Sequence, residues 1–177
     1  MSDVLTLEQR RLNMSRIRAK DTKPEMILRR GLHARGLRYR LHQRNLPGRP
    51  DLVFSSQRAV VFVHGCFWHG HDCHLFVLPA TRREFWEAKI GGNRKRDIRC
   101  LEMLRTKQWR VLTVWECALR GRDKHPLPSL LRRIEVFIKG HKPKLEVAGG
   151  VPKQAERELR PKSHSTAARV SGRQARP

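Results

Sequence analysis

The stretch of sequence that organises this chain is Ala59-Val-Val-Phe-Val-His-Gly-Cys-Phe-Trp-His-Gly-His-Asp-Cys-His74. Its first five residues are apolar and largely β-branched, which is typical of a strand buried at the centre of a sheet. Residues 62–74 then place four His and two Cys within thirteen positions. A central strand that runs into such a loop predicts a metal-bound or catalytic site at the end of that strand.

Helix and strand signals precede this strand. Thr6-Leu-Glu-Gln9 and Thr22-Lys-Pro-Glu25 both have the form of a capping box, so each is expected to open a helix. Gly36 is placed to end the second helix. Alternating apolar residues then predict a strand at residues 37–42 and another at residues 51–54. The turn residues 55–58 would close a hairpin between the second of these and the central strand.

The elements expected after the metal-binding loop are helices around one more strand. Thr81-Arg-Arg-Glu84 would cap a helix through Ile90, Gly91-Gly92 would break it, and a second helix would follow. A strand is predicted from Trp109 to Trp115, and a last helix at 127–138 has its core face at Leu130, Leu131, Ile134 and Phe137. This order predicts an α/β fold in which helices flank a mixed central β-sheet.

The composition predicts a polyanionic partner. Lys and Arg number 39 against 16 Asp and Glu, which gives a formal charge of +23, and 28 of the cations are Arg. Arginine presents a planar fork of donors that matches phosphate and guanine. A membrane-surface role would need a basic amphipathic helix with a long apolar face, so nucleic acid is the expected partner.

The cysteine usage predicts ligands or core thiols. No apolar run approaches the roughly 20 residues of a membrane span, and the first residues lack the pattern of a secretory leader. We therefore expect a reducing bacterial cytoplasm, with neither disulfides nor a membrane anchor. The four cysteines are Cys66, Cys73, Cys100 and Cys117.

The last part of the chain differs in composition from the rest. Residues 141–177 contain no aromatic residue and carry nine Lys and Arg against three Asp and Glu, interspersed with Pro and Gly. Such a segment is typical of a disordered basic tail that adds nonspecific attraction to phosphate. We therefore expect a folded domain at residues 1–140 and a tail at residues 141–177.

The loop and the later strand together offer the ligands for one zinc site. Cys66, His71 and Cys73 lie within eight residues, and Cys117 at the end of the later strand could complete a closed Cys3His set. From spacing alone, three other histidines compete for the imidazole position, and a pair of buried core cysteines is the alternative to a metal. A catalytic zinc of the deaminase type is excluded because its H-x-E and P-C-x-x-C motifs are absent.

A second metal site is suggested where two strands meet. Asp51 stands at the start of one predicted strand, and Phe62-Val63-His64 ends its neighbour, so a carboxylate would face a backbone carbonyl. Few protein oxygens combined with several waters suit magnesium. The pattern is similar to the P-D…(D/E)-x-K motif of restriction-like nucleases, although Phe62 and His64 occupy the positions of its acid and lysine.

Several separated blocks together resemble one family, the very-short-patch mismatch repair endonucleases, which have a restriction-endonuclease-like fold. The resemblance covers roughly residues 8–139 and leaves the tail outside. The blocks, in order, are Asp51, Phe62-Val-His-Gly-Cys-Phe-Trp-His-Gly-His-Asp-Cys73, Pro79-Ala-Thr-Arg82, Glu84-Phe-Trp86, Asn93-Arg-Lys-Arg-Asp97 and Trp115-Glu-Cys117.

The resemblance implies a role for three groups at a catalytic magnesium. Asp51 would bind Mg2+ directly, and the backbone carbonyl of Val63 would be a second ligand. Glu25, from the second predicted helix, would orient a metal-bound water. The zinc would be structural and would hold the loop rigid.

The resemblance also assigns the imidazoles near the scissile phosphate. His69 is the favoured general base and His64 would serve the leaving group, since an unperturbed imidazole titrates near neutral pH. Asp97 would orient His64. A surface salt bridge from Asp97 to Arg94 or Arg96 is the alternative reading of that carboxylate.

A third group of residues would contact DNA. Phe67, Trp68 and Trp86 would ordinarily be read as core aromatics, but the resemblance makes them a wedge that enters the base stack beside a mismatch. Unstacking costs least at a mispaired base, so selectivity can begin with deformability. Side chains expected to reach base edges are Met14, Lys89 and Asn93.

The expected activity is a Mg2+-dependent nick in one strand, 5′ to the T of a T:G mismatch left by deamination of 5-methylcytosine. Double-stranded DNA would be the substrate, a MutL-like matchmaker protein the partner, the chain a monomer, and the bacterial nucleoid its location. The alternative is a zinc-stabilised protein that binds mismatches without cutting. A magnesium-dependent nicking assay separates the two.

Overall fold

The centre of the molecule is one five-stranded mixed sheet with the strand order β1-β2-β3-β4-β5. The computed structural model describes residues 6, 8, 9, 12 and 20–150. Strands β1 to β3 pair antiparallel, whereas β3, β4 and β5 run parallel. The strands are β1 (Arg40–Leu41), β2 (Leu52–Phe54), β3 (Ala59–His64), β4 (Arg110–Trp115) and β5 (Lys144–Val147). The predicted α/β fold with a mixed sheet is confirmed.

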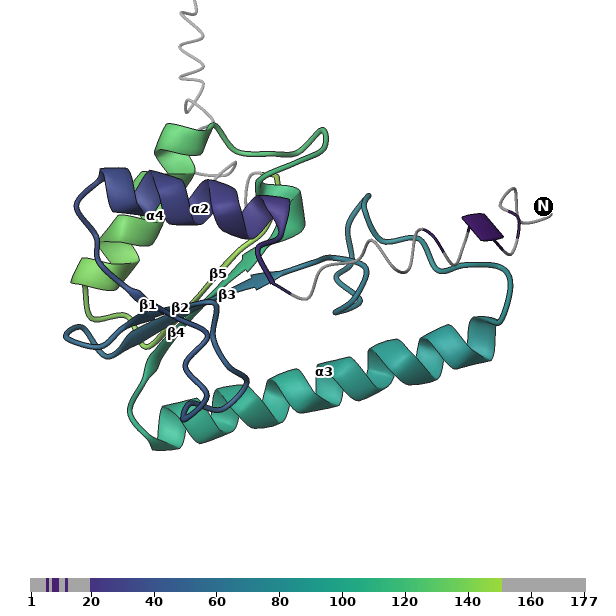
Figure 1. Cartoon of the computed structure of the whole chain (residues 1–177), viewed down its shortest axis with the longest axis horizontal. Helices are drawn as coiled ribbons and strands as arrows, with labels where there is room; N and C mark the ends of the chain where they lie inside the picture. Colours follow the sequence, from purple (N-terminus) through teal and green to yellow (C-terminus); the bar gives the residue numbers. More distant parts are fainter. Residues whose placement is uncertain (1–5, 7, 10–11, 13–19, 151–177) are drawn as a thin grey trace, which may run out of the picture.

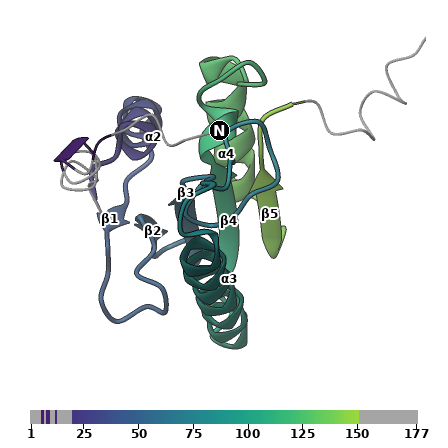
Figure 2. The ribbon, with the colours of Figure 1, turned by 90° about the vertical axis from the view of Figure 1, so that its right-hand side faces the viewer.

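Helices cover both faces of this sheet (Figure 1). Alternate residues of β3 point to opposite faces, so Ala59 and Val61 join the core under α2 (Lys23–Ala34) and α4 (Leu127–Lys139). On the other face, Val60 and Phe62 pack with Leu104 of α3 (Arg83–Thr106). Figure 2 shows α2 on the β1 side of the molecule and α4 nearer β5.

The capping signals of the first two helices are confirmed. The Thr22 hydroxyl accepts the backbone N–H of Glu25 at the start of α2, and Gly36, with φ of 80°, follows its end. Thr6 and Gln9 exchange the two reciprocal hydrogen bonds of a capping box. The rest of the first predicted helix lies outside the described residues.

The predicted helix break at Gly91-Gly92 is wrong. α3 is one continuous helix of 24 residues, and its N-cap residue is Arg82 rather than Thr81. Two glycines cost a helix about 2 kcal/mol together, which hydrogen bonding and the packing of Ile90 and Leu104 offset here. Rich in charged side chains, α3 cannot cross a membrane, and neither can any other helix among the described residues.

The predicted domain boundary at residue 140 falls too early. Residues 144–147, placed in the tail by their composition, form β5 and pair with β4 from Val111 to Val114. Leu145 and Val147 alternate with Lys144 and Glu146, and Val147 is fully buried. The predicted strand at residues 37–42 also shortens to the two residues of β1. Residues 151–177 of the expected tail lie outside the described part.

Candidate active site and metal centre

Asp51 stands where the start of β2 meets the end of β3. Its Oδ2 accepts the backbone N–H of Val63 at 2.7 Å, because the two strands run antiparallel. Asp51 and Val63 are thus neighbours, but the contact is to the N–H of Val63, and the role of its carbonyl as a metal ligand stays a prediction. They line a cavity of about 350 Å³ whose walls also include His42, His64, His69 and Asp97.

Glu25, on α2, is linked to the Asp51 carboxylate by His42, a residue that the sequence analysis did not single out. Its side chain is only 2% exposed, and Oε1 lies 3.2 Å from Nε2 of His42. The other ring nitrogen of His42 lies 3.8 Å from Oδ1 of Asp51, so the imidazole stands between the two carboxylates. Sequence reasoning missed His42, because nothing in its local sequence shows that it faces residues 17 positions earlier and nine later.

The electrostatics of this cavity favour a bound cation. Burial, assisted by the nearby charge of Glu25, raises the pKa of Asp51 to about 6. The hydrogen bond from Val63 and the imidazole of His42 oppose this rise only in part. Because the buried carboxylate of Glu25 and the half-buried carboxylate of Asp51 lie on either side of His42, a divalent cation at Asp51 would relieve their repulsion, and the residues present fit magnesium.

The two imidazoles at the cavity are stacked, but only one is paired with a carboxylate. The rings of His64 and His69 are parallel, with centroids 3.8 Å apart. Nδ1 of His69 lies 2.6 Å from Oδ2 of Asp97, which comes from α3. The prediction that Asp97 orients His64 is therefore corrected, because the helix places this carboxylate beside His69 instead. A salt bridge from Asp97 to Arg94 or Arg96 is not found among the described contacts.

His64 is the more enclosed of the two rings. Burial, together with the neighbouring His69, lowers its pKa to about 3. His64 is therefore neutral at physiological pH, where it can donate or accept a hydrogen bond but is too weak an acid to transfer a proton to a leaving group, so the leaving-group role expected from the sequence is corrected. His69 has the arrangement of a general base, since Asp97 can accept Nδ1–H and leave Nε2 free for a proton.

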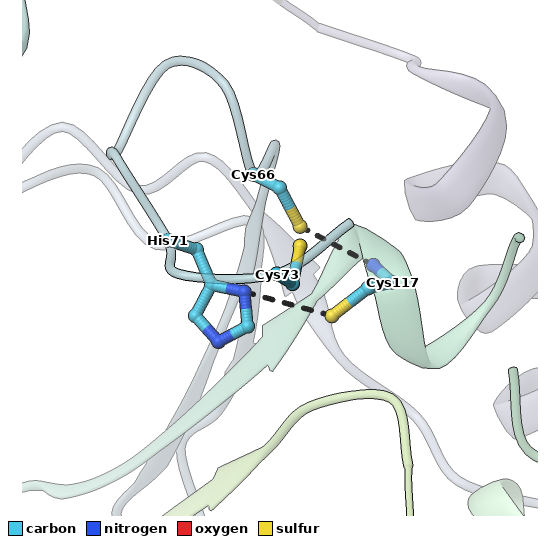
Figure 3. Close-up of side chains that lie close together, drawn as sticks. All are labelled: Cys66, His71, Cys73 and Cys117. Carbon is cyan, nitrogen blue, oxygen red and sulfur yellow. Dashed lines mark hydrogen bonds between the residues drawn. The ribbon is translucent and has the colours of Figure 1, made fainter. Parts of the chain in front are cut away.

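Four side chains form a compact metal centre beyond the end of β3 (Figure 3). The ligand atoms of Cys66, His71, Cys73 and Cys117 all lie within 4.8 Å of one another. Nδ1 of His71 is 3.6 Å from Sγ of Cys117. A tetrahedral zinc, with its usual bond lengths, separates a sulfur and a nitrogen ligand by about 3.6 Å, so the four residues fit zinc.

The surroundings of these ligands also suit a cation. Burial raises the pKa of the Cys66 and Cys117 thiols, so thiolates at this place need a positive charge beside them. Burial lowers the pKa of His71, which leaves the neutral ring that ligates metals. Backbone N–H groups already point at two sulfurs, from Cys117 to Cys66 at 3.4 Å and from Gly149 to Cys117 at 3.1 Å.

The competing ligand candidates lie elsewhere. His64 and His69 line the cavity at Asp51, and His74 pairs with Asp123 at 2.9 Å. Cys100, on α3, lines the same cavity and is not part of the cluster. The geometry thus selects His71 from the histidines that spacing alone left open.

Three aromatic side chains form a separate cluster outside the hydrophobic cores. The Phe67 ring lies 5.2 Å from the rings of both Trp68 and Trp86, in edge-to-face contacts. All three are half-buried, and none belongs to the cores on either face of the sheet. This placement favours the surface wedge over the reading of core aromatics.

The residues expected at base edges have different surroundings. Because α3 is continuous, Lys89 and Asn93 lie one turn apart on the same side of the helix. Lys89 is exposed, whereas the Asn93 amide donates to the carbonyl of Trp68 at 2.7 Å and so fixes the wedge loop to α3. Met14 lies outside the described residues.

Comparison with known proteins decides the family. Residues 2–75 match the family model described as DNA mismatch endonuclease Vsr. The DNA mismatch endonuclease Vsr of Escherichia coli K12 is 49% identical over 140 residues, which span 79% of this chain and 90% of that protein. The chain belongs to the Vsr family. The resemblance stated from the sequence motifs is confirmed.

Two type II nicking enzymes are also similar to this chain. The type II nicking enzyme V.XorIIP of Xanthomonas oryzae pv. oryzae is 48% identical over 134 residues, covering 76% of this chain and 97% of that enzyme. The type II nicking enzyme V.NmeAIP of Neisseria meningitidis is 39% identical over 137 residues, covering 76% of this chain and 98% of that enzyme. The similarity thus extends over most of each Vsr-related chain.

Proposed function

We propose that this protein is a Mg2+-dependent DNA endonuclease that nicks one strand at a mismatch, with Asp51 and the His69–Asp97 pair as its catalytic groups. The observation that carries the proposal is their convergence on one cavity, next to an aromatic cluster outside the cores. Family membership and the names of the nicking relatives support it.

Different residues would bind the metal, position the water and accept its proton during hydrolysis. Asp51 and the Val63 carbonyl would hold magnesium, which supplies positive charge for the scissile phosphate and lowers the pKa of a bound water. Glu25 positions water from the α2 side. His69 takes the proton of the attacking water on Nε2, while Asp97 fixes its tautomer and orientation through Nδ1.

His64 completes the site as a neutral partner. Its ring supports that of His69 by stacking, and it offers a hydrogen bond near the scissile phosphate. Water attacks the phosphorus and gives a proton to His69, while the bond to the 3′ oxygen breaks and that oxygen takes a proton from solvent water. The products are a 5′-phosphate and a 3′-hydroxyl.

Recognition would begin at the aromatic wedge. Phe67, Trp68 and Trp86 enter the base stack where a mispair makes unstacking cheapest. Lys89 supplies an exposed cation beside them, and Asn93 holds the loop through the Trp68 carbonyl. Zinc at the Cys3His centre keeps the same loop rigid.

The finer features rest on the family resemblance. The substrate is double-stranded DNA with a T:G mismatch from deaminated 5-methylcytosine, and the nick falls 5′ to the T. The enzyme acts as a monomer on the bacterial nucleoid, and a MutL-like matchmaker is its partner in repair.

The decisive experiment is single-turnover nicking of a T:G duplex and its matched T:A duplex, with and without Mg2+. Asp51→Asn removes the charge that draws the cation, so we expect nicking to fall by about 10³-fold or more. Binding to the T:G duplex in Ca2+ is expected to survive. Glu102→Gln serves as the control, because it removes an equal charge from an exposed position of α3 outside the cavity.

Three results would refute this assignment. They are nicking by Asp51→Asn at the wild-type rate, a reaction that continues without a divalent cation, and equal cutting of the T:G and T:A duplexes. Mismatch binding by a wild-type protein that never cuts would favour the non-catalytic alternative.

A further inference from the structure

The strand β5 and the turn after it, residues 144–150, form a segment that we call the C-terminal brace. This segment lies beyond the expected domain boundary, yet it reaches the metal centre. Gly149 donates its backbone N–H to Sγ of Cys117 at 3.1 Å. A Cβ on Gly149 would lie 2.4 Å from the backbone oxygen of Cys117, so only glycine allows this approach.

Other contacts fix the brace to the loop that follows η1 (Glu116–Ala118). Gly150 donates its backbone N–H to the carbonyl of Asp123 at 2.7 Å. The His125 ring nitrogen Nε2 lies 2.7 Å from the carbonyl of Ala148. The brace is therefore held against the metal centre, where Ala148 packs with Cys66 and Cys117.

A side chain of the brace also reaches a zinc ligand through a tryptophan. Oε1 of Glu146 accepts the indole N–H of Trp115 at 2.5 Å. The Trp115 ring stacks on that of His71, with centroids 4.2 Å apart and an angle of 19° between the planes. The edge of the same indole contacts His64 in the catalytic cavity, at 5.3 Å between centroids.

Trp115 is thus the one described side chain with ring contacts to a zinc ligand and to both catalytic-cavity imidazoles, His64 and His69. The indole is 9% exposed and packs with Cys66 and Cys117, so packing already holds its ring. Glu146, on an exposed position of β5, accepts the only donor of that ring and so adds a directional contact to the packing. Groups hydrogen-bonded directly to a metal ligand commonly change metal affinity by about 10- to 100-fold when removed, and Glu146 acts one contact further away, through the ring that stacks on His71.

We propose that Glu146 is a positioning residue that, through Trp115, holds His71 in place for zinc and His64 in place for catalysis. The proposal rests on the zinc centre proposed above and deepens it. It assigns a role in metal retention to a segment that composition had placed in the tail.

The test measures zinc content and the rate of zinc release to a chromogenic chelator, using the full chain. We expect Glu146→Ala to release zinc about tenfold faster or more than wild type. Glu146→Gln keeps an oxygen acceptor for the indole and should retain the wild-type rate. Lys144→Ala is the matched control, since residue 144 shares the strand and the face of Glu146.

A double-mutant cycle tests whether Glu146 affects zinc release through Trp115. Trp115→Phe keeps a ring beside His71 but removes the indole N–H, so it should speed zinc release as Glu146→Ala does. Adding Glu146→Ala to Trp115→Phe should then change nothing further. In nicking assays, Glu146→Ala should lower kcat and leave KM unchanged, because the disturbed contact is with His64 and not with DNA.

Release by Glu146→Ala at the rate of Lys144→Ala overturns the proposal, as does a full additional effect of Glu146→Ala in the Trp115→Phe background. If Glu146→Ala fails to fold, Trp115→Phe carries the test, and its release of zinc at the wild-type rate refutes the role. Wild-type protein with no zinc would instead refute the metal centre itself. Zinc-loaded protein that cannot nick would refute the proposed function and leave the brace intact.

Discussion

His64 and His69 lie face to face, with ring centroids 3.8 Å apart, yet their surroundings give them different chemistry. Asp97 pairs with His69, and burial keeps His64 neutral by lowering its pKa to about 3. Both are histidines at the end of one strand or in its loop, so residue type could not tell them apart. The difference comes from α3, whose register brings Asp97 to one ring and not to the other.

This pairing leads to a prediction for Asp97→Asn. An amide at this position can donate to Nδ1 of His69 and so favour the tautomer whose Nε2 carries a proton, which cannot act as a base. We expect single-turnover nicking to fall by about 10²- to 10⁴-fold, with DNA affinity in Ca2+ unchanged. Glu102→Gln removes the same charge from an exposed position of the same helix and should nick normally. Normal nicking by Asp97→Asn would show that His69 does not need this carboxylate.

At the level of the elements, most of what the sequence indicated locally is present. The capping threonine of α2, the hairpin of β2 and β3, and the core face of α4 all follow from local patterns, and the structure confirms them. The failures are at Gly91-Gly92 and at β5. In both places, tertiary contacts decide the conformation, because β5 exists by pairing with β4, and α3 is continuous across glycines that no local rule favours.

The metal centre and the catalytic cavity could be predicted in part for the same reason. Cys66, His71 and Cys73 are close in sequence and were identified, and Cys117 followed from its place at a strand end. The roles of His42 and Glu146 were missed, since their partners lie on other elements and are fixed only by the packing of the sheet. Asp97 was identified but assigned to the wrong ring.

The continuity of α3 gives a prediction about stability. A Cβ at Gly91 would meet nothing within 4 Å, so Gly91→Ala should gain helix propensity without a clash. We expect the free energy of unfolding to rise by about 1 kcal/mol, measured by urea denaturation of the zinc-loaded protein. Gly31→Ala in α2 is the contrasting variant, because its Cβ would lie 2.6 Å from Leu131 and should cancel the gain. A loss of stability in Gly91→Ala would mean that the helix does need glycine there.

On the scale of the whole molecule, the chain joins its two centres through distant segments. Asp51, just before β2, and Asp97 of α3 line one cavity, which Glu25 of α2 approaches through His42, and the segments that follow β4 and β5 contribute Cys117 and Gly149 to the metal centre. The aromatic cluster includes Trp86 of α3, and the loop that holds Phe67 and Trp68 follows β3 and is hydrogen-bonded to Asn93 of the same helix. The candidate catalytic groups and the candidate metal ligands thus lie at the same end of β3 and β4, so a disturbance of β5 at the metal ligands is expected to reach the cavity through Trp115.

The last prediction separates the brace from the segment beyond it. A chain ending at Gly140 lacks β5, Glu146 and Gly149, so it should lose zinc and unfold at lower temperature than the full chain. A chain ending at Gly150 keeps all these contacts and should bind one zinc and nick a T:G duplex at low salt.

The residues that it lacks carry seven Lys and Arg against two Asp and Glu, a surplus of five positive charges. Removing them should lower the slope of log affinity against log salt by up to about 4, with the largest loss of affinity in dilute buffer. Zinc content by mass spectrometry, thermal unfolding and a salt titration of DNA binding measure the three quantities on both truncations. Equal zinc content in the two truncated chains would remove β5 from the metal centre, and a salt slope identical to that of the full chain would show that the last residues do not touch DNA.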